Sequence, residues 1–402
     1  MIDIICFSHL RWDFVWQRPQ HLLSRLGTDY RVLFVEEPIA SAQATEPHLE
    51  VKPYNASVTV LRLIFPMSAE RWIGHGDPLT QHTYEQLLTE YMAARHIEHP
   101  LVWLYTPMAC DFVHAIPMSL LIVDVMDQLS AFKGAPTELI KREADALRSA
   151  DIVFTGGVGL FRDKLPYNPH TYLFPSGVDI EHFEAASTPS QLTLPPDIAT
   201  LQGTVLGYYG VIDERMDLEL IARLATNHPE WQIVMVGPVV KIDPAGLPRA
   251  ANIHWIGMRS YDELPAYLAR FNVALIPFAL NESTRFVSPT KTLEYMAAHK
   301  PIVSTPIRDV MELYGAVVRI GYDQASFEQH IQRALSQPAD GRLAAENELL
   351  NAATWDSIVA RMKRIITNRL PLSLREVRAK TPASIIRLPL ETIDQTALGG
   401  DR

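Results

Sequence analysis

The chain has 402 residues, of which 48% are hydrophobic and 20% are charged. That length and balance allow two α/β domains with a core each, and they exclude a disordered or fibrous protein. The formal net charge of −10 argues against a general nucleic-acid-binding protein.

The sequence shows few signals of compartment. Cys6 and Cys110 form neither a disulfide framework nor a metal-ligand spacing, and we expect two buried thiols. The chain opens directly with a strand-like segment instead of a basic region followed by an apolar core, and it has no apolar run of the roughly 18 residues that cross a bilayer. These features predict a cytoplasmic protein.

The first elements form a βαβ unit. Residues 2–8 read as a buried parallel strand, 19–26 as a helix and 31–35 as the next strand. The loop of residues 9–20 (HLRWDFVWQRPQ) follows the first strand and therefore faces the ligand crevice of such a fold. Its aromatic faces and polar groups suit a sugar, although either Trp taken alone is better explained as packing beneath the loop. The Gly-rich dinucleotide fingerprint is absent, which disfavours a dehydrogenase.

Strands and helices continue to alternate through both halves of the chain. Helices are expected at 80–95, 138–149 and 261–271, and strands within 49–65 and at 100–106, 120–125, 151–154, 171–175, 204–210, 231–236, 252–257, 271–278 and 301–305. Asp124 and Asp127 fall at the carboxyl end of the 120–125 strand, on the crevice side. A carboxylate there can accept the proton of an attacking hydroxyl, or it can simply cap a loop.

The stretch from Ser288 to Glu294 carries the strongest local signal. Ser288 is a good N-cap and Pro289 fits the first helical position. Lys291 lies in the first turn, where a cation is disfavoured unless an anion offsets it, and Glu294 lies on the same face one turn later. Ser288 and Lys291 could hold a diphosphate while Glu294 binds ribose hydroxyls. The alternative is a capped surface helix with a Lys–Glu pair.

The string SPTKTLEYMAAHKPIVST (288–305) resembles the nucleotide-sugar motif of GT-B glycosyltransferases of the family 4-like, group 1 superfamily. The resemblance implies that Lys291 lies near the donor diphosphate and that Glu294 binds ribose. One position departs from the pattern. Many retaining members have a second Glu eight residues before the ribose Glu, where this chain has Phe286, and Glu282 lies four residues too early. Retention therefore cannot be carried over.

Other segments extend the resemblance. HLRWDFVWQRPQHLLSRL (9–26) resembles the opening of a bacterial subgroup that includes teichuronic-acid glycosyltransferases, and DVMDQ (124–128) resembles its YD-x-x-D block. SGVDIEHF (176–183) resembles the element that closes the N-terminal domain of such proteins. Many members have two cations that face the donor diphosphate after the glycine that corresponds to Gly210. Val211 stands at the first of these positions, and Arg215 is the sole candidate for the second. The alternative is that Arg215 is simply solvated. The segment around 257–259 resembles the one that holds the nucleotide base of the donor.

These resemblances define the expected site. We expect Asp127 as the catalytic base, with His9 and Asp13 as rivals. The donor-binding residues are expected to be Gly210, Arg215, Gly237, Met258, Ser288, Pro289, Lys291 and Glu294, and the acceptor-binding residues Trp12, Trp16, Arg18 and Asp124. The acidic spacing is not the D-x-D of metal-dependent enzymes, so no metal and no other cofactor is implied.

The expected architecture is an α/β GT-B fold, with two Rossmann-like doubly wound domains facing a deep interdomain cleft. The predicted parts are an acceptor-side domain (1–184), a linker (185–200), a nucleotide-sugar-binding domain (201–353), a helix that crosses back to the first domain (354–372) and a basic tail (373–402). The basic excess between Arg361 and Lys380 predicts either contact with anionic lipid or a solvated face.

The expected function is transfer of a sugar from a UDP- or GDP-linked donor to a hydroxyl of a glycan or lipid-linked acceptor, in cell-surface polysaccharide or glycolipid synthesis at the inner membrane face. No nucleic-acid partner is expected. A GT-B sugar-nucleotide epimerase would share the donor site but need no acceptor. A non-catalytic sugar-nucleotide-binding protein is favoured by Val211 and Phe286, whereas the aromatic loop at 9–20 speaks for an acceptor.

Overall fold

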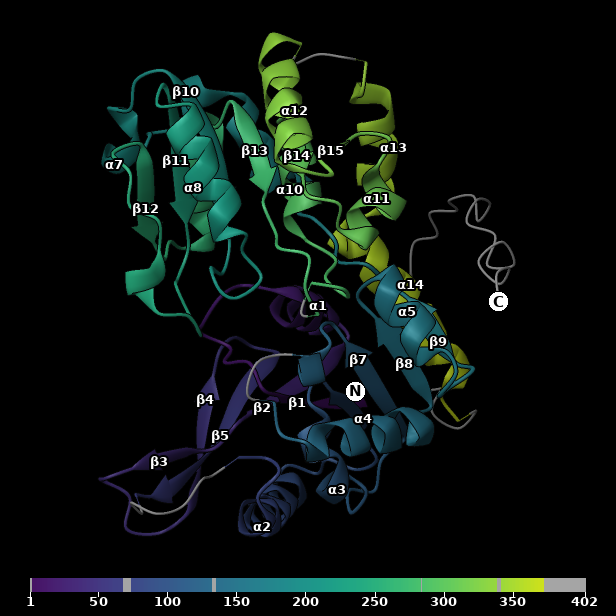
Figure 1. Cartoon of the computed structure of the whole chain (residues 1–402). Coiled ribbons are helices and arrows are strands. Elements are labelled where there is room, and N and C mark those ends of the chain that lie inside the picture. The colour runs from purple at the N-terminus through teal and green to yellow at the C-terminus, as the bar shows by residue number, and fades with distance from the viewer. Residues whose placement is uncertain (1, 68–73, 132–134, 283, 338–340, 372–402) are drawn as a thin grey trace.

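A computed structural model describes residues 2–67, 74–131, 135–282, 284–337 and 341–371. The chain builds two α/β domains, one above the other in Figure 1, and each is centred on a sheet covered by helices. The predicted α/β class and the two doubly wound domains are confirmed.

The N-terminal sheet is built around β1 (Ile2–Ser8), which is buried along nearly its whole length because helices cover both faces. The strand order is β3-β5-β2-β1-β6-β7-β8-β9, parallel throughout, and β4 adds to β5 in the antiparallel sense. The remaining bounds are β2 (Tyr30–Glu36), β3 (Ile39–Ser41), β4 (His48–Pro53), β5 (Val58–Pro66), β6 (Leu101–Leu104), β7 (Leu120–Val125), β8 (Ile152–Thr155) and β9 (Thr171–Leu173).

The C-terminal sheet is wholly parallel, with the order β12-β11-β10-β13-β14-β15. Its strands are β10 (Thr204–Tyr209), β11 (Trp231–Val236), β12 (Ile253–Gly257), β13 (Val273–Ile276), β14 (Ile302–Ser304) and β15 (Arg319–Ile320). A single apolar core runs from these strands into the helices on both faces.

The helices alternate with the strands along the chain. In the N-terminal domain they are α1 (Arg18–Leu26), α2 (Pro78–Ala94), α3 (Cys110–Val113), α4 (Glu138–Ser149) and α5 (Val158–Lys164). The later helices are α6 (Ile180–Glu184), α7 (Pro196–Ala199), α8 (Leu218–Asn227), α9 (Leu264–Arg270), α10 (Lys291–Ala297), α11 (Arg308–Tyr314), α12 (Gln324–Ser336), α13 (Leu343–Ala352) and α14 (Trp355–Arg369).

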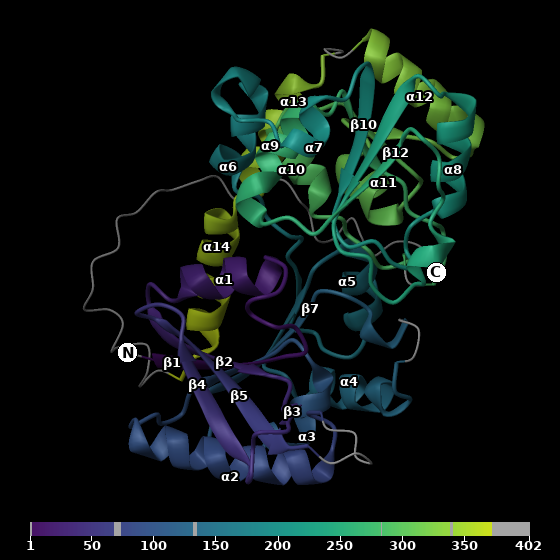
Figure 2. The ribbon, with the colours of Figure 1, turned by 90° about the vertical axis from the view of Figure 1, so that its left-hand side faces the viewer.

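Helix α14 returns to the N-terminal domain. Its buried Ile358, Met362 and Ile366 join the core formed by β1 and α1, and the helix lies beside α1 in both ribbon views (Figures 1 and 2). The apolar face of α14 thus packs on the N-terminal domain, although the helix follows the C-terminal domain in the sequence.

The segment predicted as a linker packs on the C-terminal domain. Phe183, Ala186 and Ile198 are all fully buried in the C-terminal core, and α6 lies against α10. The chain therefore changes domain between β9 and α6, before residue 185. Its apolar side chains explain why this stretch, although rich in Ser, Thr and Pro, is not an open tether.

The basic C-terminal segment is only partly within the described residues. Lys363 pairs with Asp29, Arg369 contacts His170, and Arg361 lies 5.2 Å from the ring centre of Phe174. These contacts use the basic groups within the protein, while the predicted tail (373–402) lies outside the described residues. Among the helices of the described chain, none combines the length and the apolarity needed to span a bilayer.

Candidate functional site

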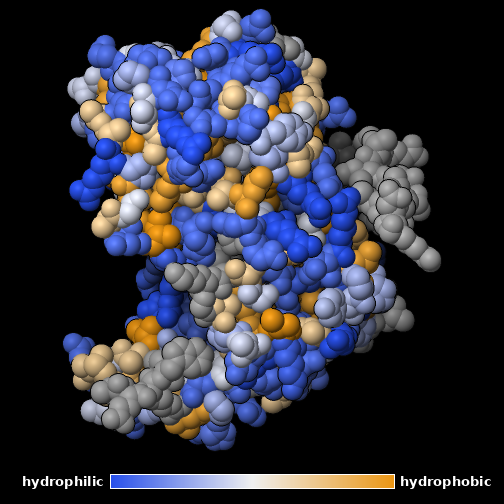
Figure 3. All heavy atoms as spheres, viewed as in Figure 1, coloured by the Kyte–Doolittle hydropathy of each residue, from blue (hydrophilic) through white to orange (hydrophobic). Residues whose placement is uncertain are grey.

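The carboxyl ends of both sheets border one cleft between the domains. It encloses about 1230 Å³, open solvent included, and the space-filling view shows the surface hollowed between the two halves on the left (Figure 3). Open α/β sheets bind ligands at this edge. Of the predicted site residues, those that line the cleft are Trp16, Arg18, Asp127, Gly210, Arg215, Gly237, Met258, Ser288, Pro289, Lys291 and Glu294.

Helix α10 presents Lys291 and Glu294 to the cleft. Burial lowers the pKa of the Lys291 ammonium, and Glu294 partly opposes that shift. Burial also raises the pKa of the Glu294 carboxyl, against the attraction of Lys291. Glu294 Oε2 is buried, and no described residue forms a close hydrogen bond with it, although the nearby Tyr209 hydroxyl favours the ionised carboxylate. A desolvated acceptor of this kind gains most from a ligand that donates hydroxyl groups.

The predicted start of this helix is wrong in detail. Ser288 does not act as the N-cap, because α10 begins at Lys291 with Thr290 in the cap position. Residues 289–293 form a tighter lead-in turn, in which Thr292 N–H donates to the carbonyl of Pro289. Ser288 instead lies beside Asp309, where it favours the ionised form of that carboxylate and so lowers its pKa. Ser288 still borders the cleft, and its predicted contact with a diphosphate stays a prediction.

Two glycines allow the backbone to approach this wall. Gly210 (φ +141°) and Gly237 (φ +145°) follow β10 and β11 with positive φ angles that disfavour other residues. A Cβ on Gly210 would lie 2.7 Å from Cε of Lys291, and a Cβ on Gly237 would collide with the carbonyl oxygen of Gly210. The two glycines therefore keep the floor of the cleft open beside Lys291.

Arg215 supplies a second cation to the same wall. Asp213 holds its guanidinium by a bidentate pair, with Nε–Oδ1 at 2.9 Å and Nη2–Oδ2 at 2.8 Å. Val211, at the position where the resemblance leads us to expect Arg, also lines the cleft. The cationic wall is thus formed by Lys291 and a fixed Arg215.

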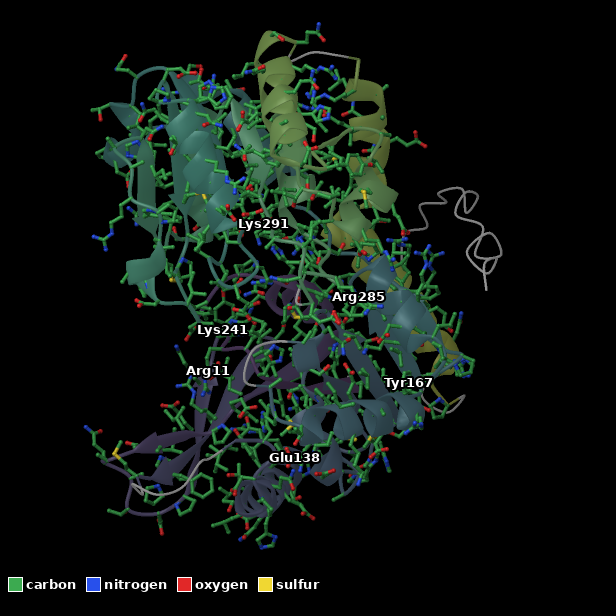
Figure 4. All side chains as sticks on the ribbon, in the orientation of Figure 1. Arg11, Glu138, Tyr167, Lys241, Arg285 and Lys291 are labelled. Carbon is green, nitrogen blue, oxygen red and sulfur yellow. The ribbon has the colours of Figure 1, made fainter. Side chains whose placement is uncertain are left out.

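Asp127 faces this wall from the N-terminal domain, in the loop after β7. Burial raises the pKa of its carboxyl, and the positive charges of Arg215, Lys291 and Lys241 oppose the rise. Figure 4 shows Lys241 and Lys291 on the lower side of the C-terminal domain, toward the N-terminal domain. The arrangement sets one carboxylate opposite several cations across the cleft.

The rival bases lie elsewhere. The His9 imidazole, 3.2 Å from the Tyr105 carbonyl oxygen, has a pKa lowered to about 4 chiefly by burial, and His9 does not line the cleft. Asp13 is half exposed and pairs with Lys52, 2.5 Å away. These placements favour Asp127 among the three candidates.

The predicted acceptor residues divide between cleft and core. Trp16 lines the cleft, whereas Trp12 is only 2% exposed and packs edge-on against Phe34. Arg18 borders the cleft but its guanidinium is committed to Asp124, with Nη2–Oδ1 at 3.0 Å and both side chains almost fully buried. For Trp12 and Asp124, direct contact with an acceptor does not fit this placement, because both are enclosed by the fold.

Sequence reasoning overlooked several cleft residues. His21 stacks on Trp355, the first residue of α14, at 4.6 Å between ring centres and an interplanar angle of 10°. Tyr261 lies edge-on to His21, at 5.4 Å, and all three line the cleft. His21, Tyr261 and Trp355 are far apart in the sequence, and Trp355 belongs to a different domain from Tyr261. No local sequence pattern could therefore group them.

Phe286 lies away from the cleft. It packs against the core of the N-terminal domain, and Arg285 Cζ lies 5.2 Å from its ring centre. At this position, where the resemblance leads us to expect an acid, the chain thus has a side chain that makes contact between the domains.

The described residues contain no group of three or more His, Cys, Asp or Glu side chains arranged to hold a metal ion. The polar chemistry of the cleft rests on Lys291, Arg215, Glu294 and Asp127.

Two facing Rossmann-like domains with a cleft between their sheets define the GT-B class. Residues 206–337 match the family model described as glycosyl transferases group 1. The match thus lies within the C-terminal domain of a chain that has the GT-B fold.

Among curated proteins, the chain is 31% identical over 136 residues to TuaH of Bacillus subtilis (strain 168), a glycosyltransferase assigned to teichuronic acid biosynthesis. The match covers 32% of this chain and 33% of TuaH. It thus relates the two proteins over a third of their length.

Several solved structures share the whole fold. Sucrose-phosphate synthase from Thermosynechococcus elongatus aligns with a TM-score of 0.68 over 95% of this chain and 100% of that chain, at 15% identity. HepE from Anabaena, in complex with UDP and glucose, aligns with a TM-score of 0.62 over 91% of this chain and 100% of that chain, also at 15% identity. A trehalose-6-phosphate structure from E. coli with UDP-2-fluoro glucose gives 0.66 over 91% and 98%, at 11% identity. Identities this low establish the fold alone.

Proposed function

We propose that the protein is a glycosyltransferase that moves a sugar from a nucleoside-diphosphate donor to a hydroxyl of a second sugar or lipid-linked glycan. One observation carries the proposal. In a cleft between two domains, the half-buried Lys291, Arg215 and Glu294 face the Asp127 carboxylate of the opposite domain. The group 1 match of residues 206–337 supports the same conclusion.

The donor binds to the C-terminal wall in this proposal. Lys291 and Arg215 hold the diphosphate, and the unpartnered Oε2 of Glu294 accepts hydrogen bonds from ribose hydroxyls. The open backbone at Gly210 and Gly237 leaves room for the phosphates. The nucleobase of the donor lies toward Met258, a side chain that is 46% exposed at the rim of the cleft.

The chemistry is displacement of the nucleoside diphosphate from the anomeric carbon. Negative charge grows on the leaving oxygen in the transition state, and two preorganised cations at low dielectric stabilise it. We propose that Lys291 and Arg215 provide this stabilisation without a divalent metal. If the configuration inverts, Asp127 accepts the proton of the acceptor hydroxyl.

The relatives suggest the substrate class. Two of the aligned structures hold UDP or a UDP-sugar analogue, and TuaH is assigned to teichuronic acid synthesis. We therefore favour a UDP-linked hexose as donor and a growing cell-surface polysaccharide as acceptor. Trp16, at the N-terminal edge of the cleft, is placed to cover a sugar face.

The test is release of UDP from UDP-hexoses in the presence of teichuronic-acid fragments and simple glycosides, with EDTA present. The proposal predicts acceptor-dependent UDP release. If the configuration inverts, Asp127→Asn should reduce this release by roughly 100-fold or more. A changed donor sugar without any acceptor would indicate the epimerase instead. Nucleotide binding with no turnover of any tested donor would indicate a binding protein.

A further inference from the structure

Asp309 joins the two domains through the N-terminus of α5. It belongs to α11 of the C-terminal domain and is 0% exposed. Its Oδ2 accepts the backbone N–H of Val158 at 2.8 Å, and its Oδ1 accepts that of Gly159 at 3.1 Å. These are the first two residues of α5, in the N-terminal domain. The first N–H groups of a helix have no intrahelical partner and are usually satisfied by a neighbouring side chain.

The α5 sequence has no local residue for that task. Its N-cap is Gly157, which has no side chain to offer. A Cβ on Gly157 would collide with Oδ2 of Asp309 and lie 2.9 Å from Cβ of Ser288. The glycine is therefore needed for the close approach of both residues, and the cap arrives from 150 positions further along the chain.

The same carboxylate holds the cleft loop. Ser288 lies beside this carboxylate, because a Cβ on Gly157 would meet both Asp309 Oδ2 and Ser288 Cβ, and Ser288 also favours the ionised form of Asp309. Ser288 comes three residues before Lys291. Two residues before Ser288, Phe286 packs on the N-terminal core, with its Cδ1 3.5 Å from a Cβ placed on Gly159. Figure 4 shows the adjacent Arg285 beside α5. The 286–291 segment is thus fixed at one end by the opposite domain and carries Lys291 at the other.

We propose that Asp309 is a positioning residue that ties the relative placement of the domains to the placement of Lys291 in the cleft. When its carboxylate caps α5, it also fixes Ser288, and the loop then presents Lys291 to the donor diphosphate. Burial raises the pKa of Asp309, and the bonds from Gly159, Val158 and Ser288 oppose that rise, as expected for a desolvated carboxylate held by several donors. The role of Lys291 rests on the proposed function, but the tie between α5 and the loop does not.

Hydrogen exchange measured by mass spectrometry tests the tie without any ligand. Asp309→Ala removes the two bonds that cap α5 and the carboxylate beside Ser288, and we expect at least tenfold faster exchange in peptides covering both 157–164 and 284–292. Ser288→Ala breaks only the link to the loop, so exchange should rise at 284–292 and stay unchanged at 157–164. Glu312→Gln is the comparison variant, because this acid on the same helix pairs with Arg162 of α5 at 2.8 Å and with Arg308 at 4.0 Å but does not cap α5. Exchange at 284–292 should therefore stay at the wild-type rate in Glu312→Gln.

Nucleotide affinity tests the consequence for the cleft. Asp309→Ala and the milder Asp309→Asn should weaken UDP binding about tenfold and leave uridine binding unchanged, because the effect passes through the cation that meets the phosphates. Thermal unfolding verifies that both variants fold. Loop exchange at the wild-type rate in folded Asp309→Ala overturns the proposal, and so does unchanged or equally weakened binding of UDP and uridine. If the wild-type protein binds no nucleotide, the proposed function fails while the exchange data still decide the tie.

Discussion

Replacing Glu294 by Gln is the most informative single change in the cleft. The substitution keeps the shape of the side chain but removes the charge of a carboxylate that faces the cleft with one oxygen lacking a hydrogen-bond partner. Because this carboxylate is already desolvated before a ligand arrives, hydroxyl donors from a ribose meet an acceptor that has lost its water. Hydrogen bonds to charged groups contribute about 1.5–3 kcal/mol, so nucleotide affinity should fall roughly 10- to 100-fold.

The effect on the free protein should be small. The raised pKa of Glu294 means that the folded state disfavours its ionised form, so neutralising it at pH 7 favours folding. The same change removes the attraction that keeps Lys291 charged, which acts in the opposite direction. We therefore expect the thermal midpoint to stay within about 3 °C of the wild-type value.

Isothermal titration with UDP, alongside a thermal melt, measures both quantities. Glu282→Gln is the matched control, since it makes the same chemical change in a carboxylate that is 74% exposed and does not line the cleft. Affinity within twofold of wild type in a normally folded Glu294→Gln protein would refute the ribose contact.

Three further changes test other parts of the site. Lys291→Met should weaken UDP binding at least tenfold without affecting uridine, and a parallel loss for both ligands would contradict a phosphate role. Burial raises the pKa of the Asp127 carboxyl above the ordinary carboxylate value of ~4. Because only the ionised carboxylate accepts a proton, kcat/KM should fall as the pH drops through this raised pKa. A kcat/KM that does not change with pH, or that is unchanged in Asp127→Asn, would show that Asp127 is not the base. Arg18→Met leaves Asp124 buried and unpaired and should cost about 3–5 kcal/mol in urea unfolding. A small loss of stability with a raised acceptor KM would instead support the predicted acceptor contact.

Local pattern predicted the elements well where burial was continuous. The strand at 120–125 and the helix at 138–149 have the predicted bounds, because a parallel strand covered on both faces reads as an unbroken apolar run and an amphipathic helix repeats every 3.6 residues. The same patterns grouped Lys291 and Glu294, which lie one helical turn apart.

Contacts between distant segments were beyond such patterns. Ser288 has the chemistry of an N-cap, yet it lies beside Asp309, whose hydrogen bonds reach α5 in the opposite domain. Arg18 and Asp124 are polar residues near a cleft, yet they form a buried salt bridge with each other. Trp355 reaches the cleft only because α14 packs beside α1. In each case the deciding partner lies more than 20 positions away.

In this interpretation, the C-terminal wall of the cleft binds a nucleoside diphosphate. Calorimetric titration with UDP, GDP and ADP, in the presence of EDTA and for both wild type and Lys291→Met, tests it most directly. The account predicts saturable binding of one nucleotide, UDP by preference, that the substitution weakens at least tenfold. No binding of any of the three nucleotides by the folded wild-type protein would contradict it and leave Lys291 and Glu294 as an ordinary helix-surface pair.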